Sequence, residues 1–332
     1  KEHPVEERAP YMESRYISCY YFHGQDLCIV PRHVREDVAW IHDHGVDGVF
    51  VGVHDADLQG GNTGMVCDII REAGLDLWLI PSRLGGLMAG WHRGPSYLGV
   101  GHPEWCARHA DGTLRHCFGP QLSVFHPDVP GAVADVVREM VDRFEARGIV
   151  WDELKSLDGE DHSDAAVKRL GHPATEEDML SGTVSCFADI NARLKAASPD
   201  LRIACFIYAS CEQDRIDACA AMDGLDEFGC DGKCWGRGES DRGEGGAEKV
   251  LLGGKDARFR HAAHSNELRS VTLLETQLLD ADALDLTLQR LPEFLDEKTG
   301  HLVYYYHPYG MADPDRYMPR IGDAIAEWRQ GT

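Results

Sequence analysis

Eight short apolar runs alternate with amphipathic helical stretches, and this alternation limits the fold more than any other feature of the sequence. The first run, residues 16–22, reads YISCYYF, and the last, residues 302–306, reads LVYYY. The others lie at residues 48–53, 75–81, 149–154, 201–208, 225–230 and 270–274. Strands that alternate with helices form a parallel sheet. Eight such units in 332 residues predict an α/β fold, a closed (β/α)8 barrel, which commonly takes about 250 residues.

We expect a single catalytic barrel over residues 16–330, preceded by an N-terminal extension over residues 1–15. A long irregular stretch, residues 82–127, follows the third run and is rich in Gly, His, Trp and Arg. A loop of this length inside a compact domain is usually functional. No GxGxxG motif follows the first run, which disfavours a dinucleotide-binding fold.

The charge balance disfavours two classes of partner. Asp and Glu total 56 and Lys and Arg total 33, which gives a net charge of −23. Such a surface repels phosphate backbones and anionic lipids, so we expect neither nucleic acid nor membrane as a partner. The sequence also has no apolar run of about 18 residues that could span a bilayer. A homo-oligomer remains open on sequence alone.

The cysteines favour a reducing compartment. There are 11, an odd number, and many fall inside apolar runs, as Cys19, Cys67 and Cys205 do. Buried free thiols are typical of a cytoplasmic protein rather than of a disulfide-rich secreted domain, so we expect a cytoplasmic location. Cys230 and Cys234 lack a second closely spaced pair and therefore argue little for zinc.

In such barrels the active site lies at the carboxyl ends of the strands. Nearly every run ends in a polar or ionisable residue, and two tryptophans lie on Gly-rich loops. The residues that we expect to bind substrate are His23, His54, Asp55, Arg83, Trp91, Lys155, Tyr208, Asp231, Trp235, His307 and Tyr309. Aromatic faces stack on sugar C–H surfaces, and His, Asp and Arg satisfy hydroxyls, so this set favours a small carbohydrate.

Carboxylates at two strand ends indicate the chemistry. Asp152 and Glu153 follow an apolar IVW run, and Glu275 follows VTLL. Because side chains alternate along a strand, only one of Asp152 and Glu153 points cleanly into the mouth. Glycosidic bond cleavage needs one carboxyl group to protonate the leaving oxygen and another to attack carbon or activate water. We predict Glu153 as the acid/base and Glu275 as the nucleophile or base, with Asp152 either supporting them or acting as the nucleophile.

Two other functions stay open. A metal-dependent sugar isomerase, epimerase or lyase would use Glu153, Asp231, His264 and Glu275 as ligands, because carboxylates and imidazoles bind divalent metals. No HExxH motif supports this alternative, and we expect no metal and no cofactor. A non-catalytic sugar-binding barrel would bind sugars without turnover.

A family resemblance follows from three segments of the chain. They are His102-Pro103-Glu104-Trp105, then Ala110-Asp111-Gly112, then GIVWDE at residues 148–153. Over about residues 75–155 this layout resembles barrel glycoside hydrolases of the α-galactosidase, α-L-fucosidase and related uncharacterised groups. The fucosidase-like pattern implies that Asp152 is the nucleophile. The β-glycosidase clan pattern implies instead that Glu153 is the acid/base and Glu275 the nucleophile, although Asp152 stands where that clan has Asn.

Overall fold

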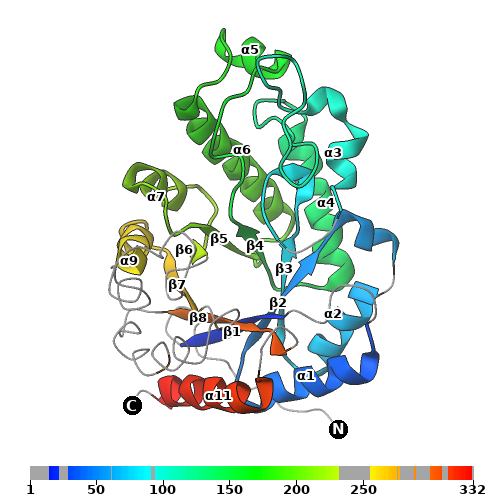
Figure 1. Cartoon of the computed structure of the whole chain (residues 1–332), viewed down its shortest axis with the longest axis vertical. Helices are drawn as coiled ribbons and strands as arrows, with labels where there is room; N and C mark the ends of the chain where they lie inside the picture. The colour runs from blue at the N-terminus through cyan, green and yellow to red at the C-terminus, as the bar shows by residue number, and fades with distance from the viewer. Residues whose placement is uncertain are drawn as a thin grey trace.

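The strands of the computed structural model close into the expected barrel. The structure describes residues 15–21, 29–60, 62–90, 94–231, 255–274, 276, 288, 300–308 and 313–330, and it describes residues 231, 255, 256 and 274 by their backbone alone. Eight parallel strands pair in sequence order, and β8 pairs with β1 (Figure 1). They are β1 Tyr16–Tyr21, β2 Gly48–Val53, β3 Asp76–Pro81, β4 Gly148–Asp152, β5 Arg202–Tyr208, β6 Glu227–Asp231, β7 Arg269–Leu274 and β8 His301–Tyr306. The (β/α)8 barrel is therefore confirmed.

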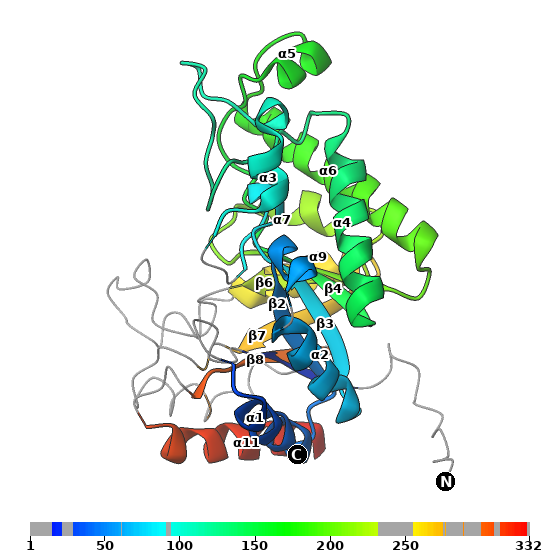
Figure 2. The ribbon, with the colours of Figure 1, turned by 90° about the vertical axis from the view of Figure 1, so that its right-hand side faces the viewer.

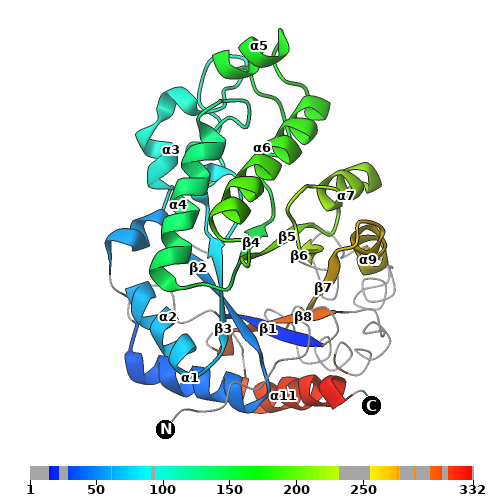
Figure 3. The same ribbon diagram turned by 180° about the vertical axis from the view of Figure 1, so that it is seen from behind.

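Helices cover the outside of this barrel (Figures 1 and 3). They are α1 Pro31–Asp43, α2 Asn62–Glu72, α4 Val129–Phe144, α6 Glu176–Ala197, α7 Gln213–Ala220, α9 Lys255–Ser265 and α11 Pro314–Gln330. α1 shows how the pattern works: Val34, Val38 and Ile41 are buried on one face, and Pro31 opens the helix where a missing N–H is harmless. The sequence also predicts a helix over residues 283–295, but the structure describes only residue 288 of this range.

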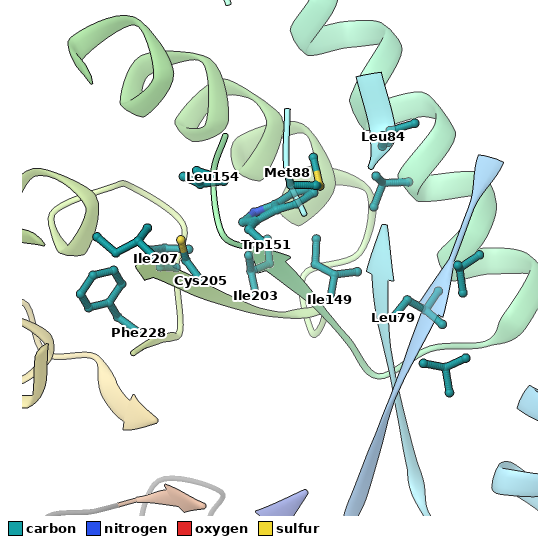
Figure 4. Packing of buried hydrophobic residues seen from close by; sticks show 14 of the residues in the cluster. Leu79, Leu84, Met88, Ile149, Trp151, Leu154, Ile203, Cys205, Ile207 and Phe228 are labelled. Carbon is teal, nitrogen blue, oxygen red and sulfur yellow. The ribbon is translucent and has the colours of Figure 1, made fainter. Parts of the chain in front are cut away.

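Alternation along each strand separates an interior core from an outer core. In β4, Ile149 and Trp151 pack in the outer core between strands and helices (Figure 4), whereas Val150 belongs to the interior cluster. Gly148 begins this strand because nothing larger fits: a Cβ there would lie 2.4 Å from the ring of Trp78. Because side chains alternate, Asp152, the last residue of β4, points to the same side as Val150, into the barrel.

The amino-terminal end of the barrel interior holds a buried polar cluster. His301 of β8 places its Nδ1 2.5 Å from Glu227 Oε2 of β6 and its Nε2 2.7 Å from Ser18 Oγ of β1. All three side chains are buried. Arg269 of β7 pairs in register with Glu227; burial lowers the pKa of its guanidinium, and the charge of Glu227 opposes that shift. We call these four residues the base cluster, because they lie at the opposite end of the barrel from the mouth.

Two excursions, after β3 and after β4, extend one side of the molecule (Figures 1 and 2). The described parts of the first, residues 82–128, contain η2 Leu84–Gly86, α3 Tyr97–Gly101 and η3 Pro103–Trp105, and the second, residues 153–175, contains α5 Asp164–Leu170. Fully buried Asp161 joins them, because it accepts hydrogen bonds from Ser123 Oγ at 2.5 Å and from Arg108 N at 3.1 Å. The described parts of the long stretch after β3 are therefore packed against the second excursion.

The nine cysteines that the structure describes are all free thiols. Cys117 and Cys211 are partly exposed, and the other seven, Cys230 included, are buried. Cys234 lies outside the described residues. None of the described helices is both long enough and apolar enough to cross a bilayer.

Candidate functional site at the barrel mouth

Asp152 ends β4 and points into the barrel mouth. It continues the interior phase of Val150, and only 5% of its surface is exposed. The hydroxyl of Tyr20, on β1 across the barrel, donates a hydrogen bond of 3.1 Å to Asp152 Oδ1. Tyr305 of β8 stacks on Tyr20 with ring centroids 5.1 Å apart. A carboxylate thus lies over an aromatic floor at the end of the barrel where chemistry takes place in this fold.

Glu153, the next residue, lies in different surroundings. Its backbone is left-handed, with φ 44°, and so departs from the extended geometry of β4. Its Oε2 lies 2.7 Å from Lys155 Nζ, and Lys155 Nζ also donates to the hydroxyl of Tyr208 at the end of β5. Asp152 therefore faces the interior, while Glu153 pairs with a cation at the rim.

Burial and pairing set the charges of this rim group. Burial lowers the pKa of Lys155, but the charge of Glu153 and hydrogen bonds to Glu153 and Tyr208 raise it above its usual range. Burial raises the pKa of Tyr208 to about 12, against the effect of its hydrogen bond with Lys155. At neutral pH Lys155 is an ammonium and Tyr208 a neutral phenol, so neither is a nucleophile. The ammonium in turn stabilises the ionised form of Glu153.

Left-handed backbone gathers at this rim. Five non-glycine residues among those described have positive φ, and two of them follow helices: Glu145 caps α4 and Glu267 lies in the turn after α9. The other three are Arg83 at φ 56°, Phe118 at φ 59° and Glu153 at φ 44°. Such conformations cost about 1–3 kcal/mol each and concentrate at active sites and ligand clamps.

Phe118 brings two cations to the same place. The guanidinium carbon of Arg83 lies 4.1 Å from the centroid of the Phe118 ring, and Lys155 Nζ lies 5.7 Å from it. Arg83 is held from its other side by a hydrogen bond of 3.3 Å from its Nε to Gly90 O. Phe118 is 43% exposed, so it offers an aromatic side chain beside two positive charges.

Backbone hydrogen bonds fix the loop after β3 to the end of β4. Ala89 N donates to Asp152 O at 2.7 Å, and Lys155 N donates to Leu87 O at 2.8 Å. Gly86 permits this packing, because its φ is 66° and a Cβ would lie 2.9 Å from a backbone carbon on the returning part of the loop. The position of Arg83 is therefore coupled to that of Asp152.

His54 and Asp55 follow β2 and are both buried. Asp55 Oδ2 accepts from Ser96 Oγ at 2.6 Å and from Leu98 N at 2.9 Å, so this carboxylate anchors the start of α3. The ring of His54 meets Tyr97 edge to face with centroids 6.0 Å apart. Tyr97 is 61% exposed and offers a second aromatic face near the end of β2.

The remaining predicted residues divide into two groups. Glu275, His23, Trp91, Trp235 and Tyr309 lie outside the described residues, and so does the side chain of Asp231, whose backbone ends β6. His307 follows β8 and is half-buried.

Two of the four ligands considered for the metal alternative, Glu153 and His264, have described side chains, and they lie at opposite ends of the barrel. Within the described ranges, no group of three or more His, Cys, Asp or Glu side chains is arranged to hold an ion. His264, one of the proposed ligands, is exposed in the last turn of α9 just before β7 begins, which is the end of the barrel away from the mouth.

Three residues of the mouth were not predicted. Tyr20 and Tyr305 form the floor, and Phe118 joins Arg83 to Lys155. The alternation in YISCYYF, which sets Tyr16, Ser18 and Tyr20 on one face, could have identified Tyr20 as an interior residue. No local pattern identifies Phe118, because its neighbours come from two other segments of the chain.

No family model and no curated protein matches the sequence. In fold, the chain is similar to the catalytic domain of β-amylase from Paenibacillus polymyxa, with a TM-score of 0.65 at 10% identity over 96% of this chain and 99% of that one. It is also similar to a β-galactosidase from Marinomonas ef1, with a TM-score of 0.62 at 12% identity over 95% of this chain and 59% of that one. A third similar structure is the GH36 α-galactosidase AgaB from Geobacillus stearothermophilus, with a TM-score of 0.61 at 9% identity over 97% of this chain and 42% of that one. The chain spans less than two thirds of each galactosidase.

These three structurally similar proteins are glycoside hydrolases, the class of enzyme that the sequence segments also resemble. At about 10% identity the likeness establishes the barrel and not the reaction.

Proposed function

We propose that the chain is a glycoside hydrolase in which Asp152 acts at the anomeric carbon. One observation carries the proposal: a carboxylate at the end of β4 faces the mouth of the barrel and accepts a hydrogen bond from Tyr20. Barrels of similar fold in the β-amylase and the galactosidases lend support. A small carbohydrate is the proposed substrate, and the free thiols suit a cytoplasmic location.

In the proposed reaction the Asp152 carboxylate attacks the anomeric carbon while the bond to the leaving oxygen breaks. A second carboxyl group gives its proton to that oxygen. Water then attacks the glycosyl ester, its proton returns to the second carboxylate, and Asp152 is released. Tyr20 orients Asp152 and stabilises its charge through the hydrogen bond.

We assign the proton donor to Glu275, which follows β7 directly. Glu153, the acid/base predicted from sequence, is less suited to this role, because an ammonium 2.7 Å away favours its ionised form. Glu153 instead holds Lys155 beside Tyr208, and these side chains would bind sugar hydroxyls. Asp231, at the end of β6, is the other carboxylate that the experiment must test.

The test compares Asp152→Asn, Glu275→Gln, Asp231→Asn and Glu153→Gln on a panel of 4-nitrophenyl and 2,4-dinitrophenyl glycosides. Asp152→Asn should lower kcat on the order of 10³-fold or more, and azide should restore turnover by forming a glycosyl azide. The proton-donor variant should lose about 10²- to 10⁴-fold on poor leaving groups and far less on dinitrophenyl glycosides, which need little protonation.

Asp158→Asn is the matched control, because this exposed carboxylate follows the same strand but pairs with Arg215. It should keep wild-type turnover. Near wild-type rates in Asp152→Asn would refute the proposal. If the protein binds a stoichiometric divalent metal and a chelator abolishes turnover, a metal-dependent reaction replaces the proposed carboxylate mechanism.

A further inference from the structure

The rim group of Arg83, Lys155 and Glu153 carries one more positive than negative charge, in a chain whose net charge is −23. We propose that the substrate is a glycoside whose sugar bears an anionic oxygen group, either the carboxylate of a uronic acid or a sulfate or phosphate ester, and that Arg83 binds this group. The proposal rests on the proposed function, since it names the substrate class of the same site.

Within the part of the chain that the structure describes, a hydrogen bond positions the guanidinium of Arg83 and no carboxylate neutralises its charge. Its Nε donates to Gly90 O, and no carboxylate among the described residues pairs with it. Arg147 and Arg202, also partly exposed, pair with Asp76 at 3.3 Å and Asp226 at 3.2 Å. Burial lowers the pKa of Arg83, and no carboxylate charge opposes that shift. The terminal nitrogens of Arg83 therefore remain available to a ligand.

Phe118 gives these donors a fixed place. Stacking on the ring holds the guanidinium at 4.1 Å and leaves the N–H groups at its planar edge. A carboxylate, sulfate or phosphate accepts two parallel hydrogen bonds from such a fork, whereas a neutral hydroxyl does not match its charge. The left-handed backbone of both Arg83 and Phe118 indicates that the loop is held in this arrangement at a cost in stability.

Lys155 and Glu153 form a compensated pair, so the unmatched charge of this rim group belongs to Arg83. The loop of Arg83 is bonded to the backbone of Asp152 through Ala89. An anionic group on Arg83 would thus lie in the same mouth as the attacking carboxylate, and the guanidinium would offset the repulsion between these two negative charges.

The test measures kcat/KM on matched 4-nitrophenyl glycosides: glucoside against glucuronide, galactoside against galacturonide, and each neutral hexoside against its 6-sulfate. Wild type should prefer a charged member at least about tenfold, and the uronide and sulfate arms identify the source of the charge. Arg83→Gln should lower the charged-to-neutral ratio by about 10- to 100-fold, because a hydrogen bond to a charged group is lost.

Arg83→Lys keeps the charge without the planar fork and should lower the ratio less. Arg108→Gln is the matched control: Arg108 lies in the same excursion, donates to Gly112 O at 2.7 Å, and its loss should leave the ratio unchanged. If Arg83→Gln does not fold, Arg83→Lys carries the test, and a wild-type ratio in that variant overturns the inference.

Preference for the neutral members, or a ratio that Arg83→Gln leaves unchanged, overturns the inference while the proposed function stands. If wild type turns over no glycoside, the proposed function fails and calorimetry decides the inference. Methyl glucuronide should then bind wild type more tightly than methyl glucoside does, and Arg83→Gln should abolish the difference. Equal binding of the two sugars overturns anion recognition.

Discussion

Glu227→Gln should lower the free energy of unfolding by about 3–5 kcal/mol, although the two side chains have nearly the same shape. Glu227 and His301 are fully buried and 2.5 Å apart, and the charge of Glu227 acts directly on buried Arg269. The amide removes the negative charge of Glu227 that compensates Arg269, and losing charge compensation in a buried site is costly. Domains are commonly stable by about 5–15 kcal/mol, so this single change would consume much of the total.

Ser18→Ala is the matched control within the base cluster. It removes one hydrogen bond of 2.7 Å to His301 and no charge, so we expect a loss of about 1 kcal/mol. The difference between the losses of unfolding free energy in Glu227→Gln and Ser18→Ala separates the ionic contribution of the cluster from its hydrogen bonding.

Urea denaturation at pH 7, followed by far-ultraviolet circular dichroism, measures both variants, and the slope of the unfolding free energy should not change. If Glu227→Gln costs no more unfolding free energy than Ser18→Ala, the ionic description of the cluster is wrong. Because the cluster lies at the opposite end from the mouth, turnover at low temperature should persist in both variants.

Three further outcomes are expected. Tyr20→Phe should lower kcat/KM on aryl glycosides by about 10- to 100-fold, since a hydrogen bond to a charged group contributes about 1.5–3 kcal/mol; an unchanged value would contradict the role of Tyr20. Iodoacetamide should label Cys117 before Cys67, and peptide mapping measures the order. Cys117 is partly exposed; burial raises the pKa of its thiol, but the charges of Lys155 and Arg83 oppose that rise. Cys67 is buried, and burial raises the pKa of its thiol to about 12. Lys155→Met should be less stable than wild type at neutral pH. Because the folded-state pKa of Lys155 is raised, the difference is fully present below the unfolded-state pKa of about 10.4 and is lost as pH rises through the folded-state value. Denaturation at stepped pH tests this, and a difference that grows in alkali would refute it.

The fold could be predicted because its signal is local. Each strand is a short apolar run and most helices carry an apolar stripe, so eight β units could be counted from periodicity alone. Periodicity does not indicate α9, because its buried residues Phe259, Ala262 and Ala263 lie within a charged sequence. It does not indicate α5 either, because this helix has only seven residues and buries only Ala166.

The mouth could be predicted only in part. Asp152 and Glu153 were both marked by their position after an apolar run, but alternation alone left open which of them enters the barrel. The interior phase of Val150 and the hydrogen bond from Tyr20 decide for Asp152, and the contact with Lys155 assigns Glu153 to the rim. These contacts depend on how the strands close into a barrel, which hydrophobic periodicity along the chain does not determine.

The sequence by itself determined the number of β units, the barrel class and the strand ends at which carboxylates gather, because hydrophobic periodicity is a property of neighbouring residues. Only the tertiary structure decided that Tyr20 meets Asp152 and that Phe118 brings Arg83 to Lys155. These contacts join segments far apart in the chain, and their geometry depends on strand register, barrel closure and the packing of long loops.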